Sequence, residues 1–127
     1  GTATTFDILD KNGDFLGGVI MPGPNLQFRA LNKSTSKLPK IDANTVDKAI
    51  GNNTADAILS GVIRGSACAI EGLIEQCEAE LEDRAVIIAT GGYSSLISKY
   101  MNRQFDFVNP YLTLEGLRFL YELNKDK

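Results

Sequence analysis

The sequence contains no histidine and only two cysteines, and both scarcities restrict the chemistry that it can perform. Without histidine, this chain alone cannot build a His-based catalytic triad or the usual zinc site. Cys68 and Cys77 are nine positions apart in a strongly helical stretch, so their Cα atoms would lie about 13 Å apart, beyond disulfide reach. Reduced thiols and the lack of a secretory signal predict a cytoplasmic protein.

Long apolar runs and excess positive charge are also missing. The apolar runs fall short of the roughly 20 residues that span a bilayer, so no membrane partner is expected. The net charge is −3 and the sequence pI is about 4.9, which gives no general attraction to nucleic acid. There is no P-loop and no dinucleotide-binding glycine fingerprint. With 127 residues, 43% hydrophobic and 23% charged, the chain is typical of one compact globular domain.

The first half of the chain predicts a β-hairpin followed by helices. Residues 4–9 and 15–21 are β-rich and flank a turn that contains Asn12-Gly13, and Gly17-Gly18 marks a bulge or a close backbone approach. Residues 25–31 predict a short helix, 34–45 a loop, and 46–50 a short helical turn. A long helix is expected from Asn53-Thr54 to about residue 81, because apolar residues recur there at steps of three and four.

The second half predicts alternating strands and helices. The apolar run 85–90 is typical of a strand buried on both faces, and Gly91-Gly92 follows it directly. A helix over 94–101, a strand over 105–108 and a closing helix over 112–125 complete the order ββ-α-α-β-α-β-α. This order predicts an α/β domain with a mixed sheet. A further strand before Gly1 would be needed to join the antiparallel hairpin to the parallel strands.

Four small residues form a stripe on the predicted long helix. Glycine in a helix interior costs about 1 kcal/mol, so another backbone is expected to come close to the stripe. The helix packing on its own sheet and a subunit interface both explain it. The stripe consists of Gly61, Gly65, Ala69 and Gly72.

Three segments are candidates for binding phosphate, nucleotide or an anionic substrate. The hydroxyl-rich start of the chain, Gly1 to Thr5, allows close approach of phosphate oxygens, although threonine also simply favours strands. Thr90-Gly91-Gly92 follows a strand, where α/β sheets gather ligands, or it is only a tight turn. Asn53-Thr54 can cap the long helix or present its N–H groups to an anion. Together they favour a nucleotide-binding α/β domain.

The same segments resemble, in order, those of the type III pantothenate kinases. The resemblance covers nearly the whole chain, and its specificity lies in the order of six individually weak motifs. They are Gly1-Thr2-Ala3-Thr4-Thr5-Phe6-Asp7, the strand and turn Phe15 to Gly23, the loop Ser34 to Pro39, Ile50-Gly51-Asn52-Asn53-Thr54 with Ser60-Gly61, Ala89-Thr90-Gly91-Gly92, and Asn109 to Leu117.

The resemblance implies an actin-like, ribonuclease H-like fold of the acetate and sugar kinase superfamily. Residues 1–127 would be the C-terminal domain of a two-domain, homodimeric kinase that phosphorylates pantothenate with ATP at the start of coenzyme A synthesis. It implies Mg²⁺ with the nucleotide and a monovalent cation, potassium or ammonium. Gly1 and Thr2 would contact ATP phosphate, Gly91 and Gly92 would lie near the nucleoside, and Thr54 and Thr35 would contact pantothenate.

The family's phosphate loop, its catalytic aspartate and its cation-binding aspartate have no counterpart in this chain. We therefore expect no catalytic and no metal-binding residue here, and we expect the chain alone to be inactive. Asp7 and Asp10 do not replace the missing residues, because the first lies within the hairpin and the second in its turn. The alternatives are a non-catalytic regulator or binding protein of the same fold, and another small-molecule kinase of the superfamily.

Overall fold

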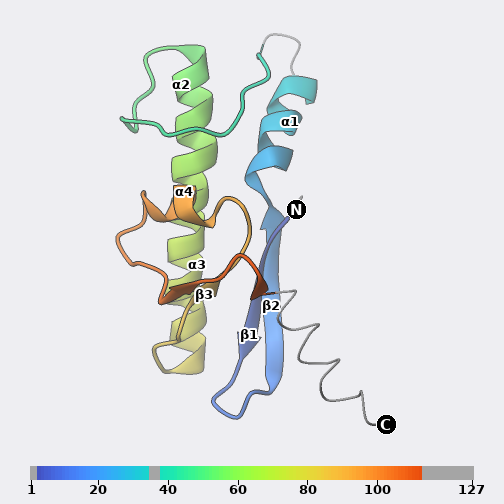
Figure 1. The fold of residues 1–127 in the computed structure, drawn as a ribbon, viewed down its shortest axis with the longest axis vertical. Helices are drawn as coiled ribbons and strands as arrows, with labels where there is room; N and C mark the ends of the chain where they lie inside the picture. The colour runs from blue at the N-terminus through green and yellow to red at the C-terminus, as the bar shows by residue number, and fades with distance from the viewer. Residues whose placement is uncertain (1–2, 35–37, 113–127) are drawn as a thin grey trace.

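The computed structural model describes residues 3–34 and 38–112 (Figure 1). Over these residues the predicted order of elements is confirmed, while the predicted closing helix lies, beyond its first residue, outside them. The elements are β1 (Ala3–Leu9), β2 (Phe15–Pro22), α1 (Pro24–Ser34), α2 (Thr54–Leu59), η1 (Ser60–Arg64), α3 (Gly65–Leu81), β3 (Ile88–Ala89), α4 (Ser94–Ser98) and β4 (Phe107–Val108).

The antiparallel hairpin of β1 and β2 forms as predicted, with Ala3 opposite Pro22. Asp10 organises its turn, because its carboxylate accepts the N–H groups of Asn12 and Asp14 at 2.8 and 2.9 Å. The register shifts between Ile8 and Leu9, which marks a bulge beside Gly17.

Gly18 provides the close backbone approach that the sequence indicates. A Cβ atom on Gly18 would lie 2.1 Å from the carbonyl oxygen of Phe6 across the hairpin. Both alternatives considered for Gly17-Gly18, the bulge and the close approach, are therefore present at adjacent residues.

The long helix extends from Thr54 to Leu81 as one continuous rod with a π-helical turn at Ser60–Arg64 (Figure 1). Its start is capped by Asn53, and its C-terminal cap is Glu82, which adopts a left-handed conformation with φ of 58°. The π turn was not foreseen from the sequence. Such turns are often associated with functional sites.

The predicted helical turn over 46–50 is wrong, since these residues follow an irregular path with bends. Hydrogen bonds from side chains, instead of the backbone hydrogen bonds of a helix, fix this segment. Tyr100 Oη accepts the N–H of Val46 at 2.7 Å, and Arg64 donates to the carbonyl oxygens of Val46 and Asp47 at 3.1 and 2.9 Å. The Arg64 guanidinium lies 4.8 Å from the Tyr100 ring centroid, a cation–π contact.

Two apolar clusters line the long helix and form the core. One joins α1, residues 38–46 and the first half of the helix, with Ile63 completely buried. The other packs α4 and Ile87 against the second half, around Ala67, Ile70 and Ile74. The other elements therefore pack against the long helix, which is the central element of the fold.

The parallel pair β3 and β4 is confirmed, but three expectations about the sheet and the helix after β3 are corrected. Only Ile88 and Ala89 form β3, and the run around it is not buried on both faces: Val86 is 68% and Ile88 54% exposed. Within the described residues, the hairpin and the parallel pair are two separate two-stranded sheets and not one mixed sheet. Ile87, which precedes β3, packs against the apolar cluster of α3 and α4, and no described strand pairs with both sheets. The helix after β3 is also shorter than predicted, ending at Ser98.

The helix from Thr54 to Leu81 is long and apolar enough to cross a membrane by length and composition alone, with a mean hydropathy of 1.5. Of its most apolar window, 44% is buried inside the molecule. Core helices of globular domains have the same properties, and both apolar clusters pack on this one.

Candidate functional site

The start of the long helix is a well-formed cap with an exposed hydroxyl beside it. The side chain of Asn53 accepts the N–H of Asp56 at 2.9 Å and donates to the Asp56 carboxylate at 2.9 Å. Asn53, and not Thr54, is therefore the capping residue. Thr54 occupies the first helical position and is exposed, and its hydroxyl has no hydrogen-bond partner among the described residues. It is free to meet a ligand.

The segment before the cap is pressed against the first turn of the helix. A Cβ atom on Gly51 would lie 2.3 Å from the backbone nitrogen of Ala57. The Ser60 hydroxyl, one turn further along, donates to the carbonyl oxygen of Ala49. The glycine at position 51 thus permits the loop to reach the helix start, and this contact fixes where Asn53 and Thr54 lie.

Thr54 is at the edge of an apolar groove between α1 and the long helix. The groove has a volume of about 610 Å³. Its lining is largely apolar, with the hydroxyl of Thr54 and the amide of Gln27 as the polar groups. The lining residues are Gln27, Ala30, Leu31, Leu38, Thr54, Ala57, Ile58, Gly61 and Val62.

The glycine turn after β3 is open on its outer side. Gly91 has φ of 102°, a conformation that favours glycine. A Cβ atom on either Gly91 or Gly92 would meet nothing within 4 Å in the described part of the chain. The turn closes onto α4 through the Ser94 hydroxyl, which donates to the carbonyl of Thr90 at 2.8 Å. A flat group can therefore approach this backbone closely.

Two further contacts place this turn among its neighbours. The N–H of Asn109 donates to the carbonyl of Ala89 at 2.8 Å, so the carboxyl ends of β3 and β4 lie together. The Tyr93 hydroxyl donates to Asn25 Oδ1 at 2.5 Å. Asn25 follows the end of β2, which is paired with the start of β1 at Ala3. The glycine turn, the end of β2 and the start of β1 are thus linked at one corner of the molecule.

The predicted site residues fall into two separate places. Gly91 and Gly92 lie in the turn between β3 and α4, and α4 packs beside the middle of the long helix, whereas Thr54 is the first residue of that helix (Figure 1). The structure does not bring Thr54 and the glycine turn together. Gly1, Thr2 and Thr35 lie outside the described residues, although β1, which begins at Ala3, starts at the corner just described.

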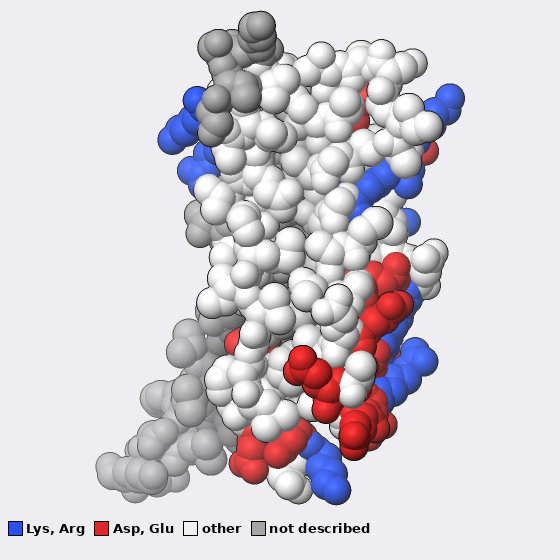
Figure 2. Space-filling model, turned by 180° about the vertical axis from the view of Figure 1, so that it is seen from behind, with Lys and Arg blue, Asp and Glu red and all other residues white. Residues whose placement is uncertain are grey.

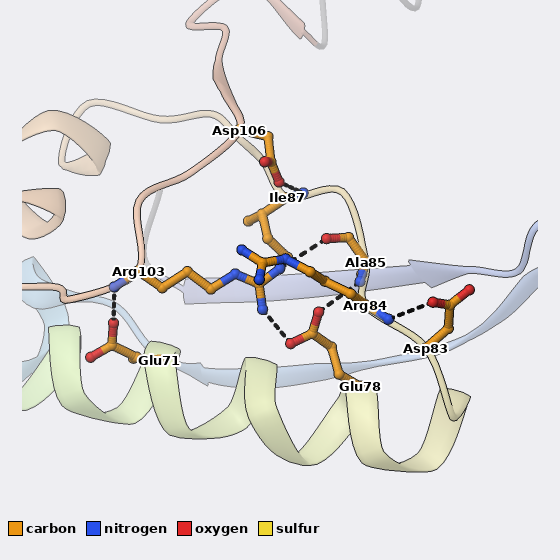
Figure 3. A network of polar contacts seen from close by, with 8 residues as sticks. All are labelled: Glu71, Glu78, Asp83, Arg84, Ala85, Ile87, Arg103 and Asp106. Carbon is orange, nitrogen blue, oxygen red and sulfur yellow. Dashed lines mark hydrogen bonds and ion pairs between the residues drawn. The ribbon is translucent and has the colours of Figure 1, made fainter.

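A charged network that sequence reasoning missed supports the segment leading to the glycine turn (Figure 3). Arg103 forms an ion pair with Glu78 of α3 and also donates to the carbonyl of Ala85 at 2.9 Å. The Arg103 hydrogen bond lowers the pKa of the Glu78 carboxyl below its ordinary value. The partners are 25 residues apart in sequence, and no local sequence motif indicates the pair.

Three small residues of the stripe have no close neighbour among the described residues. Cβ atoms on Gly61, Gly65 and Gly72 would meet nothing within 4 Å. Close packing of the stripe on the chain's own sheet is therefore wrong for the described residues. From behind, the charged side chains gather toward the edges, and a broad area of this face carries neither Lys, Arg, Asp nor Glu (Figure 2).

Fold and site together define an α/β domain whose candidate ligand edge lies where parallel strands end. The sequence model of one family, type III pantothenate kinase, matches residues 1–76. The chain belongs to the type III pantothenate kinase family.

Curated relatives carry the same name over nearly the whole chain. A type III pantothenate kinase of Dehalococcoides mccartyi (strain CBDB1) is 50% identical over 125 residues, which is 98% of this chain and 47% of the relative. Those of Cereibacter sphaeroides (strain ATCC 17029) and Moorella thermoacetica are 42% and 41% identical and are covered to 49% and 48%. The chain thus spans about half the length of the curated relatives it matches.

A solved structure shares the fold. The crystal structure described as a conserved putative Baf family transcriptional activator from Campylobacter jejuni superposes with a TM-score of 0.66 at 23% identity. The match covers 99% of this chain and 56% of the other.

Proposed function

We propose that this chain is the C-terminal domain of a two-domain, actin-like kinase that transfers the γ-phosphoryl group of ATP to the primary hydroxyl of pantothenate. Membership of the family, with relatives of that name at 41–50% identity, is the observation that carries the proposal. The product, phosphopantothenate, would enter coenzyme A synthesis. The protein would act as a cytoplasmic homodimer, with no nucleic acid or membrane partner.

The nucleotide would lie against the turn at Gly91 and Gly92. The open space beside both residues in the described part of the chain fits the close approach of a nucleoside, and the lack of side chains leaves the backbone accessible. Gly1 and Thr2 would face the phosphates, since they precede the strand that starts at the same corner. ATP supplies the phosphoryl group, and this chain's part is to bind and orient the nucleotide.

Pantothenate would meet Thr54, whose free hydroxyl borders the apolar groove. A hydroxyl beside an apolar wall suits a substrate that carries both polar groups and methyl groups. Thr35 is a second candidate on the substrate side. Since Thr54 is remote from the glycine turn along the helix, we infer that a partner subunit or the other domain completes the pocket.

Mg²⁺ would accompany the nucleotide, and potassium or ammonium would serve as the monovalent cation. Among residues 3–34 and 38–112, no group of three or more Asp, Glu, Cys or His side chains lies placed to hold a metal ion. The described part of the chain therefore does not fit a metal centre, and we derive no step through a metal from its residues.

The test is pantothenate-dependent consumption of ATP by the full-length protein, that is, this chain with the remaining half of the length that its relatives span. Turnover with pantothenate and not with other small alcohols and acids would support the proposal. Nucleotide binding without turnover of any acceptor would instead indicate a non-catalytic relative, and turnover of another acceptor would indicate a different kinase of the superfamily.

A further inference from the structure

Arg103 ties three separate segments together (Figure 3). Its backbone N–H donates to Glu71 Oε2 at 2.5 Å, its Nη1 forms the ion pair with Glu78, and its Nη2 donates to the carbonyl oxygen of Ala85 at 2.9 Å. Glu71 and Glu78 lie on α3, two turns apart. The segment after α4 is thus fixed to the rigid helix at two points.

Glu78 completes the arrangement from the helix side. Its second carboxylate oxygen accepts the N–H of Ala85 at 2.6 Å. Both backbone polar groups of Ala85 are therefore held by one ion pair. The side chains of Arg103 and Glu78 are only 19% and 15% exposed, so water screens the pair less than it would a pair on the open surface.

The restraint on Ala85 continues along the chain toward the glycine turn. The N–H of Ile87 donates to the Asp106 carboxylate at 2.6 Å, and the Ile87 carbonyl accepts from Asp106 and Phe107 at 2.9 and 3.1 Å. β3 then contributes two residues before the turn begins. A strand pair this short is marginal by itself, so its position depends on what holds the residues before it. The Ile87 side chain in the core is the other anchor.

We propose that Glu78 and Arg103 are positioning residues for the nucleotide, which set the location of the Gly91-Gly92 turn by clamping Ala85 to the long helix. This inference rests on the proposed function, in which that turn receives the nucleoside. Neither side chain touches the ligand. Loss of the clamp lets β3 shift relative to α3. A small displacement of the backbone that binds the nucleotide weakens the binding.

Binding of ATP to the full-length protein, measured by calorimetry, tests this role separately from catalysis. Glu78→Gln removes the ion pair while it keeps the size of the side chain, and we expect the Kd for ATP to rise roughly three- to tenfold. The KM for pantothenate at saturating ATP should stay within about twofold. Glu80→Gln is the matched control, because Glu80 lies exposed on the same helix, and it should leave both constants within about twofold.

Arg103→Lys provides a second variant that keeps the ion pair and loses the hydrogen bond to Ala85. A smaller rise in the Kd for ATP is expected for this variant. Arg103→Lys also tests the inference if Glu78→Gln does not fold. A lower melting temperature with unchanged ATP binding in both variants would overturn the inference, because the pair would then be a structural contact only.

The outcomes separate the inference from the proposed function. If the full-length protein binds ATP without phosphorylating pantothenate, and Glu78→Gln still weakens ATP binding, the function fails and the positioning role stands. If pantothenate is phosphorylated and ATP binding is the same in both variants, the function stands and the positioning role fails. A full-length protein that does not bind ATP would overturn both.

Discussion

At the scale of single residues, Thr54 is the side chain that we would test first. In the structure Asn53 performs the capping, so the first-turn role of Thr54 is small and Thr54→Ala should cost less stability than the about 1 kcal/mol of a lost cap. A lost hydrogen bond to pantothenate should raise the KM for pantothenate several-fold and leave the KM for ATP nearly unchanged.

One control variant and one contradicting outcome complete this first prediction. Thr54→Ser keeps the hydroxyl and should keep most activity in steady-state kinetics of the full-length protein. Equal changes for both substrates, or a shift in melting temperature with unchanged kinetics, would mean that Thr54 does not contact pantothenate.

Gly51 gives a second prediction at this scale. Because a Cβ atom would lie 2.3 Å from the backbone nitrogen of Ala57, Gly51→Ala should destabilise the protein by about 1–3 kcal/mol through overpacking. Chemical denaturation measures this. The displaced loop should also raise the KM for pantothenate. Gly92→Ala is the matched comparison, since residue 92 has no positive φ and an added methyl group would meet no described residue within 4 Å. Equal stability losses in the two variants would contradict the packing argument.

Glu78 makes the pH response of the clamp predictable. Arg103, with Ala85 N–H and the charge of Arg84, lowers the carboxyl pKa from its ordinary value of 4.5, and the charges of Asp106 and Glu75 also act on Arg103. A lowered folded-state pKa stabilises the fold above the ordinary pKa, and the stabilisation is lost as the pH falls through the lowered value.

The third prediction is therefore a difference that depends on pH. Wild type should be more stable than Glu78→Gln near pH 7, and the gap between their melting temperatures should close as the pH drops below the ordinary carboxyl pKa. A gap that is constant from neutral to strongly acidic pH would contradict the assignment.

At the scale of elements, the long helix has a stripe of small residues that lacks a close neighbour in the described part of the chain. Cβ atoms on Gly61, Gly65 and Gly72 would meet nothing within 4 Å among the described residues, and the proposed homodimer would cover this stripe. Gly65→Leu in the full-length protein should weaken the proposed dimer by steric overpacking and barely change the stability of the monomer. Glu75→Leu, exposed on the same helix outside the stripe, should leave the dimer intact. Sedimentation that shows an unaltered dimer for Gly65→Leu would exclude the stripe from the interface.

The elements differ in how far the sequence determines them. The hairpin was predictable because Asn12-Gly13 fixes its turn, and the long helix because Asn53 is a local start signal and the apolar period is sustained. β3 was overestimated, since the length and burial of a strand depend on its neighbours in the sheet. The run 85–90 has apolar residues on both faces, yet Ile87 packs against the core while Val86 and Ile88 stay exposed.

The candidate site was predictable only where the sequence carries a local signal. Gly91-Gly92 was found because glycines directly after an apolar run are a local signal. Contacts between distant residues leave no such signal. Tyr93 and Asn25 meet across 68 residues, and Arg103 and Glu78 across 25, so only the folded chain reveals them.

At the scale of the whole molecule, the described chain exposes surface that a stable domain normally covers. Ile20 in the hairpin is 81% exposed and Phe107 in the parallel pair 63%. The isolated 127-residue chain should therefore aggregate or bind apolar dyes, because exposed strand edges and apolar patches associate. It should also show no pantothenate-dependent turnover. A sharp, reversible melt of the isolated chain as a monomer would contradict this prediction.

The central claim is that the complete protein phosphorylates pantothenate, and the most direct measurement is detection of the product. Purified full-length protein is incubated with ATP, Mg²⁺, potassium and pantothenate, and phosphopantothenate is quantified by mass spectrometry. We predict formation of phosphopantothenate in step with ATP consumption, and none when pantothenate is omitted. A full-length protein that is folded, binds ATP and forms no phosphopantothenate would contradict the account.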